Sequence, residues 1–212
     1  MNCWLVIGAL TLHVLAMESS QAEAILKDLG TKYVPQSFHN DLIADHLNAD
    51  QFSTSHYAYE AIRGICKSGN VNWVTSLEGS RVVPELLKEL DQFSAIRRDS
   101  FGGSIMDILG RMVAITGSAS GIIQHQGALS FVQLIDRILE KAPMMSRWQG
   151  HYYRRAYILL LALLECEESG QFIPAILQTN LAHHAMLSMK EWEKDVKMVA
   201  VSRSAVAFLG KL

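Results

Sequence analysis

The stretch that decides the fold is "SASGIIQHQGALSFVQLIDRIL", residues 118 to 139. A short run of mixed polarity stops at Gly127, and an amphipathic run begins immediately after it. Glycine ends helices readily because it adopts the left-handed backbone conformation without strain. The stretch therefore predicts two helices that meet at a sharp corner.

The same corner recurs along the chain. The segments "AILKDLGTKYVP" at 24–35 and "VTSLEGSRVVP" at 74–84 share a pattern of Gly, a hydroxyl residue, a basic residue, two apolar or aromatic residues and Pro. Their glycines, Gly30 and Gly79, are 49 residues apart, and Gly127 follows 48 residues later. A weaker fourth copy has Asn180 at its corner, and Asn is the next-best residue for a left-handed helix end. Corners near 30, 79, 127 and 180 therefore predict a repeated unit.

Each unit is expected to contain a short helix, a middle helix and a long helix. The short helices include "NVNWVT", and the middle helices have apolar residues at i, i+1 and i+4, a pattern typical of a helix packed on one side. Long apolar helices are predicted at about 4–17, 55–67, 104–116 and 151–166, with a fifth within 194–212. Residues predicted to be almost fully buried between units are Ile62, Leu86, Leu87, Ile135, Leu139, Leu160, Leu163 and Met186.

This three-helix unit resembles the armadillo repeat. "GALSFVQLIDRIL", from Gly127 to Leu139, is similar to the second helix of that family, and "AYEAIRGICKSG" at 58–69 is similar to its third helix. The resemblance implies an all-α, right-handed α-solenoid of about four armadillo-like three-helix repeats, formed by residues 1–212 as a single domain. Its first repeat would be incomplete, and its long third helices would line a concave binding groove.

Composition restricts the class of protein. Half of the 212 residues are hydrophobic and only four are proline, as expected for a globular chain with a sizeable core. The net charge of −2 gives no support for binding to nucleic acid. Three widely separated cysteines without a CxxC pair suit a reducing compartment. We therefore expect a cytoplasmic protein, with a nuclear location left open.

The first seventeen residues, "MNCWLVIGALTLHVLAM", permit two interpretations. They are apolar enough for a signal peptide, which would make the protein a secreted effector. However, no Lys or Arg precedes the apolar run, no clear cleavage site follows it, and it is too short to span a membrane comfortably. A buried helix is favoured. Because almost no charge covers this helix, we expect another copy, a partner or further repeats to pack on it.

Other motifs give weaker signals. "HNDLIADH" at 39–46 separates its histidines by two helical turns, too far for one metal ion. "RWQGHYYRR" at 147–155 permits base stacking, a protein interface, or simply inward Tyr and outward Arg on a structural helix. Gly102 and Gly103 indicate a hinge or a helix entry. Cys66 and Cys166 are predicted to be buried, unreactive thiols. No catalytic motif is present, so we expect no enzyme activity, no metal and no cofactor.

The predicted function is that of a scaffold or adaptor that binds a partner helix or extended segment in the groove. A chaperone cofactor or small-GTPase regulator is the alternative, by analogy of fold. Polar positions on the long helices form the predicted contact set: His56, Glu60, Arg63, Lys67, Asp107, Arg111 and Arg154. Their mixed signs argue against a uniformly acidic or basic ligand.

Overall fold

The computed structural model describes residues 44, 59, 62–67, 69–96, 102–141, 147–193 and 199–212. Every regular element in these ranges is a helix, which confirms the all-α class. The predicted corner at Gly30, the helix at 4–17 and the contact residues His56 and Glu60 lie outside the described residues. The backbone divides into two compact units, Met1–Leu86 and Leu87–Leu212.

The first unit contains the short helix α5 (Val71–Glu78), as "NVNWVT" predicts. The side chain of Asn70 accepts a hydrogen bond from the backbone nitrogen of Trp73 and so caps the helix start. Gly79 ends α5 with a φ of −78°, so this corner does not use the left-handed conformation. The Ser80 hydroxyl closes it instead, because it donates to the carbonyl oxygen of Leu77 and accepts from the nitrogen of Val82.

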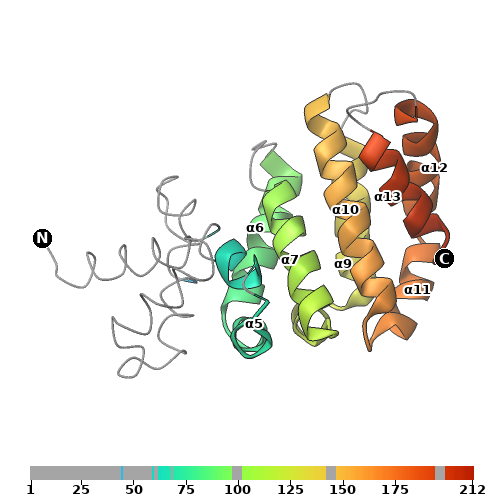
Figure 1. The fold of residues 1–212 in the computed structure, drawn as a ribbon. Coiled ribbons are helices and arrows are strands. Elements are labelled where there is room, and N and C mark those ends of the chain that lie inside the picture. The colour runs from blue at the N-terminus through green and yellow to red at the C-terminus, as the bar shows by residue number, and fades with distance from the viewer. Residues whose placement is uncertain are drawn as a thin grey trace, which may run out of the picture. The chain divides into compact units, whose positions relative to one another are not determined.

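Helix α6 (Val82–Ile96) contains the boundary between the units, and seven helices follow it in the second unit (Figure 1). These are α7 (Gly102–Thr116), α8 (Ser120–Gln126), α9 (Ala128–Lys141), α10 (Arg147–Glu165), α11 (Ser169–Leu177), α12 (Leu181–Trp192) and α13 (Val199–Leu209). Along the chain, a short helix, a middle helix and a third helix follow one another three times from α5 to α13. The short helices begin at Val71, Ser120 and Ser169, with 49 residues between successive starts.

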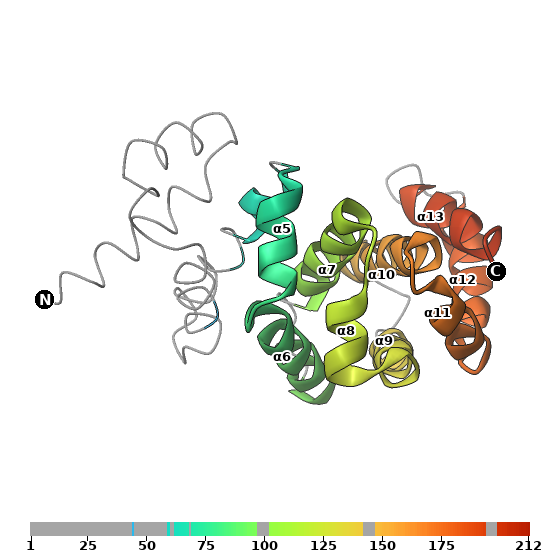
Figure 2. The same ribbon diagram turned by 90° about the horizontal axis from the view of Figure 1, so that it is seen from below.

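The third helices of the second unit lie side by side in one layer. Helix α10 packs between α7 and α13, and α9 and α12 lie behind them in the other layer (Figures 1 and 2). Aromatic contacts join α10 to α13 within its own layer and to α12 in the other layer. Tyr157 stacks on Phe208 with ring centres 5.8 Å apart, and Tyr153 meets Trp192 edge-on at 5.3 Å.

Helices α7 and α10 approach closely because α7 carries glycines on the side that faces α10. A Cβ atom on Gly110 would lie 3.1 Å from the Cα of Leu159, which is backbone and cannot turn aside. Gly103 leaves similar room for the side chains of Tyr152 and Arg155. Helix α7 begins at Gly102, so Gly102 and Gly103 form the helix entry that the sequence predicts.

The corners of the second unit are closed in two ways. Between α8 and α9, Gly127 has a φ of 76° and a ψ of 150°, as its corner position predicts. Between α11 and α12, Thr179 repeats the role of Ser80: its hydroxyl donates to the carbonyl of Ile176 and lies 3.5 Å from the nitrogen of Leu181. Asn180 lies at this corner, as predicted, but its φ is −87°, so the left-handed conformation is not used here. A hydroxyl that links both helix ends makes a positive φ unnecessary.

The predicted core is confirmed at Ile62, Leu86, Leu87, Ile135, Leu139, Leu160 and Leu163, all of which are buried. Met186 is the exception, since 54% of its surface is exposed. The inward stripe of α12 consists of Leu181, Ala185, Ser188 and Trp192. Met186 follows Ala185 by one residue, a rotation of about 100° that carries it out of the stripe.

Candidate protein-binding face

One row of α10 faces solvent. It consists of Arg154, Ile158, Leu161 and Glu165, spaced at i, i+4, i+7 and i+11 so that they share one side of the helix. Arg154 and Glu165 are exposed, and Ile158 and Leu161 are half-buried. The remaining sides of the helix contact α7, α9, α11 and α13.

Corresponding rows occur on the two neighbouring helices. On α7 the row contains Asp107, Arg111 and Ala114, and on α13 it contains Arg203, Val206 and Ala207. We call these three rows together the outer face. Its members are Asp107, Arg111, Ala114, Arg154, Ile158, Leu161, Glu165, Arg203, Val206 and Ala207. Val206 is 49% exposed, so the face offers apolar as well as charged surface.

The register of the helices places Arg154 and Arg203 at corresponding positions of α10 and α13. Leu159 lies against Gly110, 49 residues earlier, which fixes the register of α7 and α10. Between α10 and α13, an ion pair joins Glu165 to Lys211, which are 46 residues apart in the sequence. A ring contact joins Tyr157 to Phe208, which are 51 residues apart. Arg154 and Arg203 are 49 residues apart, between these values, and each belongs to the outward row of its helix.

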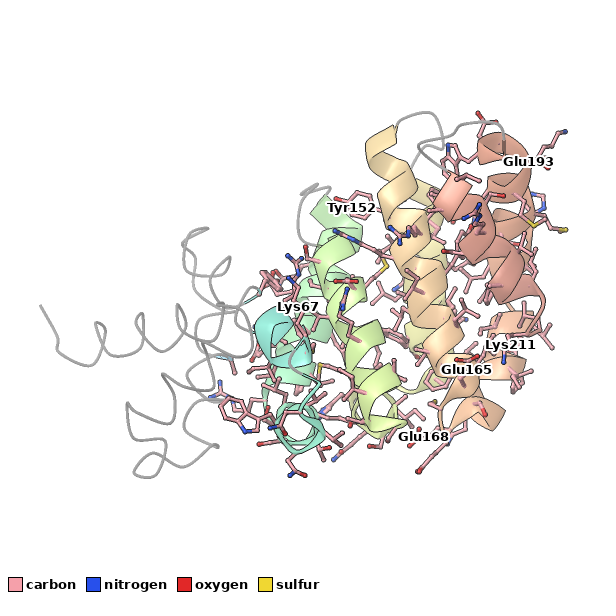
Figure 3. All side chains as sticks on the ribbon, viewed as in Figure 1. Lys67, Tyr152, Glu165, Glu168, Glu193 and Lys211 are labelled. Carbon is pink, nitrogen blue, oxygen red and sulfur yellow. The ribbon has the colours of Figure 1, made fainter. Side chains whose placement is uncertain are left out.

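The carboxylates of the outer face already have cationic partners. The Nε atom of Arg111 lies 3.1 Å from Oδ2 of Asp107, one turn earlier on α7. Lys211 Nζ lies 2.9 Å from Oε1 of Glu165, and Figure 3 shows this pair at the neighbouring ends of α10 and α13. In the described ranges, Arg154, Arg155 and Arg203 make no hydrogen bond or ion pair. The outer face with Lys211 therefore carries four cations against two carboxylates.

The structure brings together part of the predicted contact set. Asp107, Arg111 and Arg154 lie on the outer face. Arg63 is half-buried and Lys67 exposed in the first unit, and the whole set stays a prediction. The sequence interpretation missed Arg203 together with the apolar residues Ile158, Leu161 and Val206. The 49-residue spacing from Arg154 was the signal that could have found Arg203.

Two adjacent residues of the aromatic and basic segment at 147–155, Tyr153 and Arg154, lie in opposite environments. Tyr153 is buried, and its hydroxyl donates to the carbonyl oxygen of Leu139 at 2.8 Å, whereas Arg154 is exposed. Burial raises the pKa of Tyr153 to about 12. Tyr153 therefore packs in the core, and the basic residue beside it is presented to solvent.

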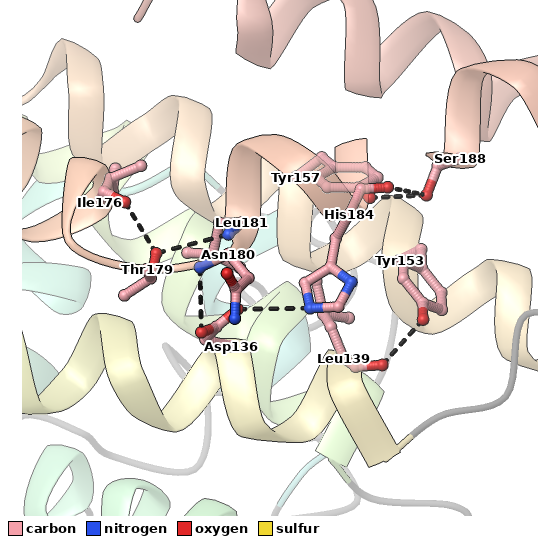
Figure 4. Close-up of polar contacts among 10 residues, drawn as sticks. All are labelled: Asp136, Leu139, Tyr153, Tyr157, Ile176, Thr179, Asn180, Leu181, His184 and Ser188. Atoms are coloured by element: carbon pink, nitrogen blue, oxygen red, sulfur yellow. Dashed lines mark hydrogen bonds and ion pairs between the residues drawn. The ribbon is translucent and has the colours of Figure 1, made fainter. Parts of the chain in front are cut away.

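A polar cluster links α9 to α12 in the other layer (Figure 4). Oδ2 of Asp136 accepts a hydrogen bond from the backbone nitrogen of Asn180, and Oδ1 lies 3.4 Å from Nε2 of His184. Burial lowers the pKa of His184, while the charges of Asp136 and Glu140 oppose this change. This cluster fastens the start of α12 to α9.

A buried hydroxyl pair joins α10 to α12 next to this cluster (Figure 4). The Ser188 hydroxyl donates to the backbone carbonyl of His184, so the Tyr157 hydroxyl, at 2.7 Å, donates to Ser188. Burial raises the pKa of Tyr157, which keeps this hydroxyl protonated as a donor. Ser188 therefore hydrogen-bonds to the backbone carbonyl of His184 and not to its imidazole ring.

The described part of the chain also bears on thiol, metal and membrane-spanning sites. Cys66 and Cys166 are buried, as predicted, and neither sulfur is part of a disulfide. Burial raises the pKa of Cys166 to about 11. Among the described residues, no three or more His, Cys, Asp or Glu side chains gather where they could hold a metal ion. None of the helices described is both long enough and apolar enough to cross a membrane.

Comparison of the chain with protein-family models, curated proteins and solved structures finds no significant match.

Proposed function

We propose that this chain is a non-catalytic protein–protein interaction scaffold or adaptor that binds a segment of a partner protein across the outer face. The observation that supports this most directly is the composition of that face. Half-buried Ile158 and Leu161 and exposed Val206 lie among arginines on adjacent helices. Arginine is enriched at binding hot spots because it combines apolar contact with directed hydrogen bonds.

The proposal extends to the architecture. The three successions of short, middle and third helices, with 49 residues between short-helix starts, support a stack of armadillo-like repeats. Such stacks present their aligned helices as a continuous binding surface. In this chain, that surface would be the layer of α7, α10 and α13.

The test uses the full chain and a matched pair of variants. The first variant, Ile158→Glu with Leu161→Glu, places charge in the apolar part of the outer face. The control, Leu177→Glu with Leu187→Glu, places the same charges on exposed apolar positions of α11 and α12. Partners captured by the intact chain from a lysate would be cross-linked and the cross-links mapped by mass spectrometry.

The expected result is that cross-links fall on 154–165 and 203–207, and that only the first variant loses the partner. Circular dichroism melting curves confirm that both variants fold. Cross-links concentrated elsewhere, with the first variant binding normally, would overturn the proposal.

A further inference from the structure

The basic charge of the outer face is localised. Arg154 and Arg203 stand at corresponding positions of α10 and α13, and the pair Glu165 and Lys211 lies further along the same two helices. Because an exposed ion pair such as Glu165–Lys211 largely cancels its own charge, the excess positive charge is concentrated at the two arginines. Ile158 and Leu161 lie on the same row of α10, between these charged ends.

Arg155 adds a third cation beside this pair. A Cβ atom added to Gly103 would lie only 2.7 Å from Nη1 of Arg155. The guanidinium of Arg155 therefore lies against α7 and not in the outward row of α10. The described residues supply no carboxylate to Arg154, Arg155 or Arg203. By contrast, the chain as a whole has a net charge of −2, so the charge of this arginine cluster is opposite in sign to that of the whole chain.

On the basis of the proposed function, we infer that the partner segment is acidic, with carboxylates that bind Arg154 and Arg203 and apolar side chains that rest on Ile158 and Leu161. A guanidinium fits a carboxylate with two parallel hydrogen bonds. Neighbouring helices are about 8–10 Å apart. Residues i and i+2 of an extended chain point to the same side and lie about 7 Å apart. Two acidic residues at i and i+2 of an extended partner can therefore reach both arginines, whose long side chains cover the remaining distance.

An acidic protein segment fits the face better than a nucleic acid does. Nucleic-acid grooves combine basic residues with exposed aromatic rings on which bases stack. Among the described members of the outer face there is no aromatic residue, and the apolar ones are aliphatic. Aliphatic surface next to arginine matches a peptide with leucine-like and acidic side chains.

The experiment measures binding of labelled probes to the full chain by fluorescence anisotropy. The acidic probe is an 18-residue peptide of Glu-Leu-Glu repeats, and matched peptides carry Gln or Lys at each Glu position. An 18-nucleotide polyuridine serves as the nucleic-acid probe. The test variant is Arg154→Glu with Arg203→Glu. The control, Arg137→Glu with Lys190→Glu, reverses the same amount of charge on exposed residues of α9 and α12.

We expect the acidic peptide to bind most tightly, and its affinity to fall at least tenfold in the test variant and less than twofold in the control. Higher salt should also weaken it. Any of four results would overturn the inference of an acidic partner. These are equal binding of the Gln peptide, unchanged binding of the acidic peptide to the test variant, tighter binding of polyuridine, and no binding of the acidic peptide. The cross-linking experiment with Ile158→Glu and Leu161→Glu reports separately on the proposed function, so the two failures are distinguishable.

Discussion

Oε2 of Glu168 lies 2.7 Å from the backbone nitrogen of Ala119, 49 residues earlier in the chain. The other carboxylate oxygen accepts from the hydroxyl of Ser118 at 2.9 Å. Next to them, the backbone nitrogen of Glu167 donates to the carbonyl of Gly117. The turn after α7 and the turn after α10 are therefore fastened directly to each other, so these two helices are joined at their ends as well as along their lengths.

Replacement of Glu168 by Ala should lower the free energy of unfolding by about 1–2 kcal/mol, because it removes two hydrogen bonds worth roughly 0.5–1.5 kcal/mol each. Urea denaturation measures this change. The control is Glu167→Ala, since Glu167 is exposed and takes part through its backbone. Equal losses in the two variants would contradict a role for the Glu168 side chain.

The same carboxylate should make stability depend on pH. Partial burial alone would raise the pKa of Glu168, but the hydrogen bonds from Ala119 and Ser118 outweigh it, and the pKa is lowered. The contribution is therefore complete above the unfolded pKa of about 4.3 and is lost as the pH falls through the lower folded pKa. Denaturation between pH 3 and 7 should show a shallower acid loss for Glu168→Gln than for the intact chain.

Replacement of Asp136 by Asn should lower the pKa of His184 further, because the charge of Asp136 opposes the effect of burial. NMR titration of the His184 ring measures this, with exposed His183 as the internal reference. Because the folded pKa lies below the unfolded value of about 6.5, unfolding should become easier as the pH falls through that value. A His184 pKa that does not respond to the substitution would show that the 3.4 Å contact has no electrostatic effect.

Gly127→Ala should destabilise the chain by about 1–3 kcal/mol, since a φ of 76° with a ψ of 150° is accessible almost only to glycine. No atom lies within 4 Å of the added Cβ, so the cost is backbone strain alone. Gly170→Ala is the control, because that glycine is helical with similar open space. Thermal melting should show a loss for the first variant and no loss for the second.

Gly110→Val should cost about 1–3 kcal/mol through overpacking against the backbone of Leu159. Ala114→Val, one turn later on the exposed side of α7, should cost only a few tenths of a kcal/mol from helix propensity. Chemical denaturation compares the two. Similar stabilities would mean that α7 and α10 can move apart without penalty.

The order of helices and most of the core could be predicted from the amino-acid sequence alone. Helical periodicity sets which residues face inward, so Leu86, Ile135 and Leu160 were identified correctly. Gly127 was also recognisable, because only glycine tolerates its backbone conformation without strain. These properties depend on residues close together in the chain, where local sterics and apolar spacing act.

Only the tertiary structure decided features that depend on distant neighbours. Met186 satisfies the same periodic pattern as its buried neighbours, and its exposure depends on where the surrounding helices lie. Asn180 does not need a positive φ because the hydroxyl of Thr179 links the adjoining helix ends. The backbone N–H of Asn180 donates to the carboxylate of Asp136, 44 residues earlier in the chain. The outer face likewise requires α10 between α7 and α13, because packing on both sides of a helix determines which of its rows remains in solvent.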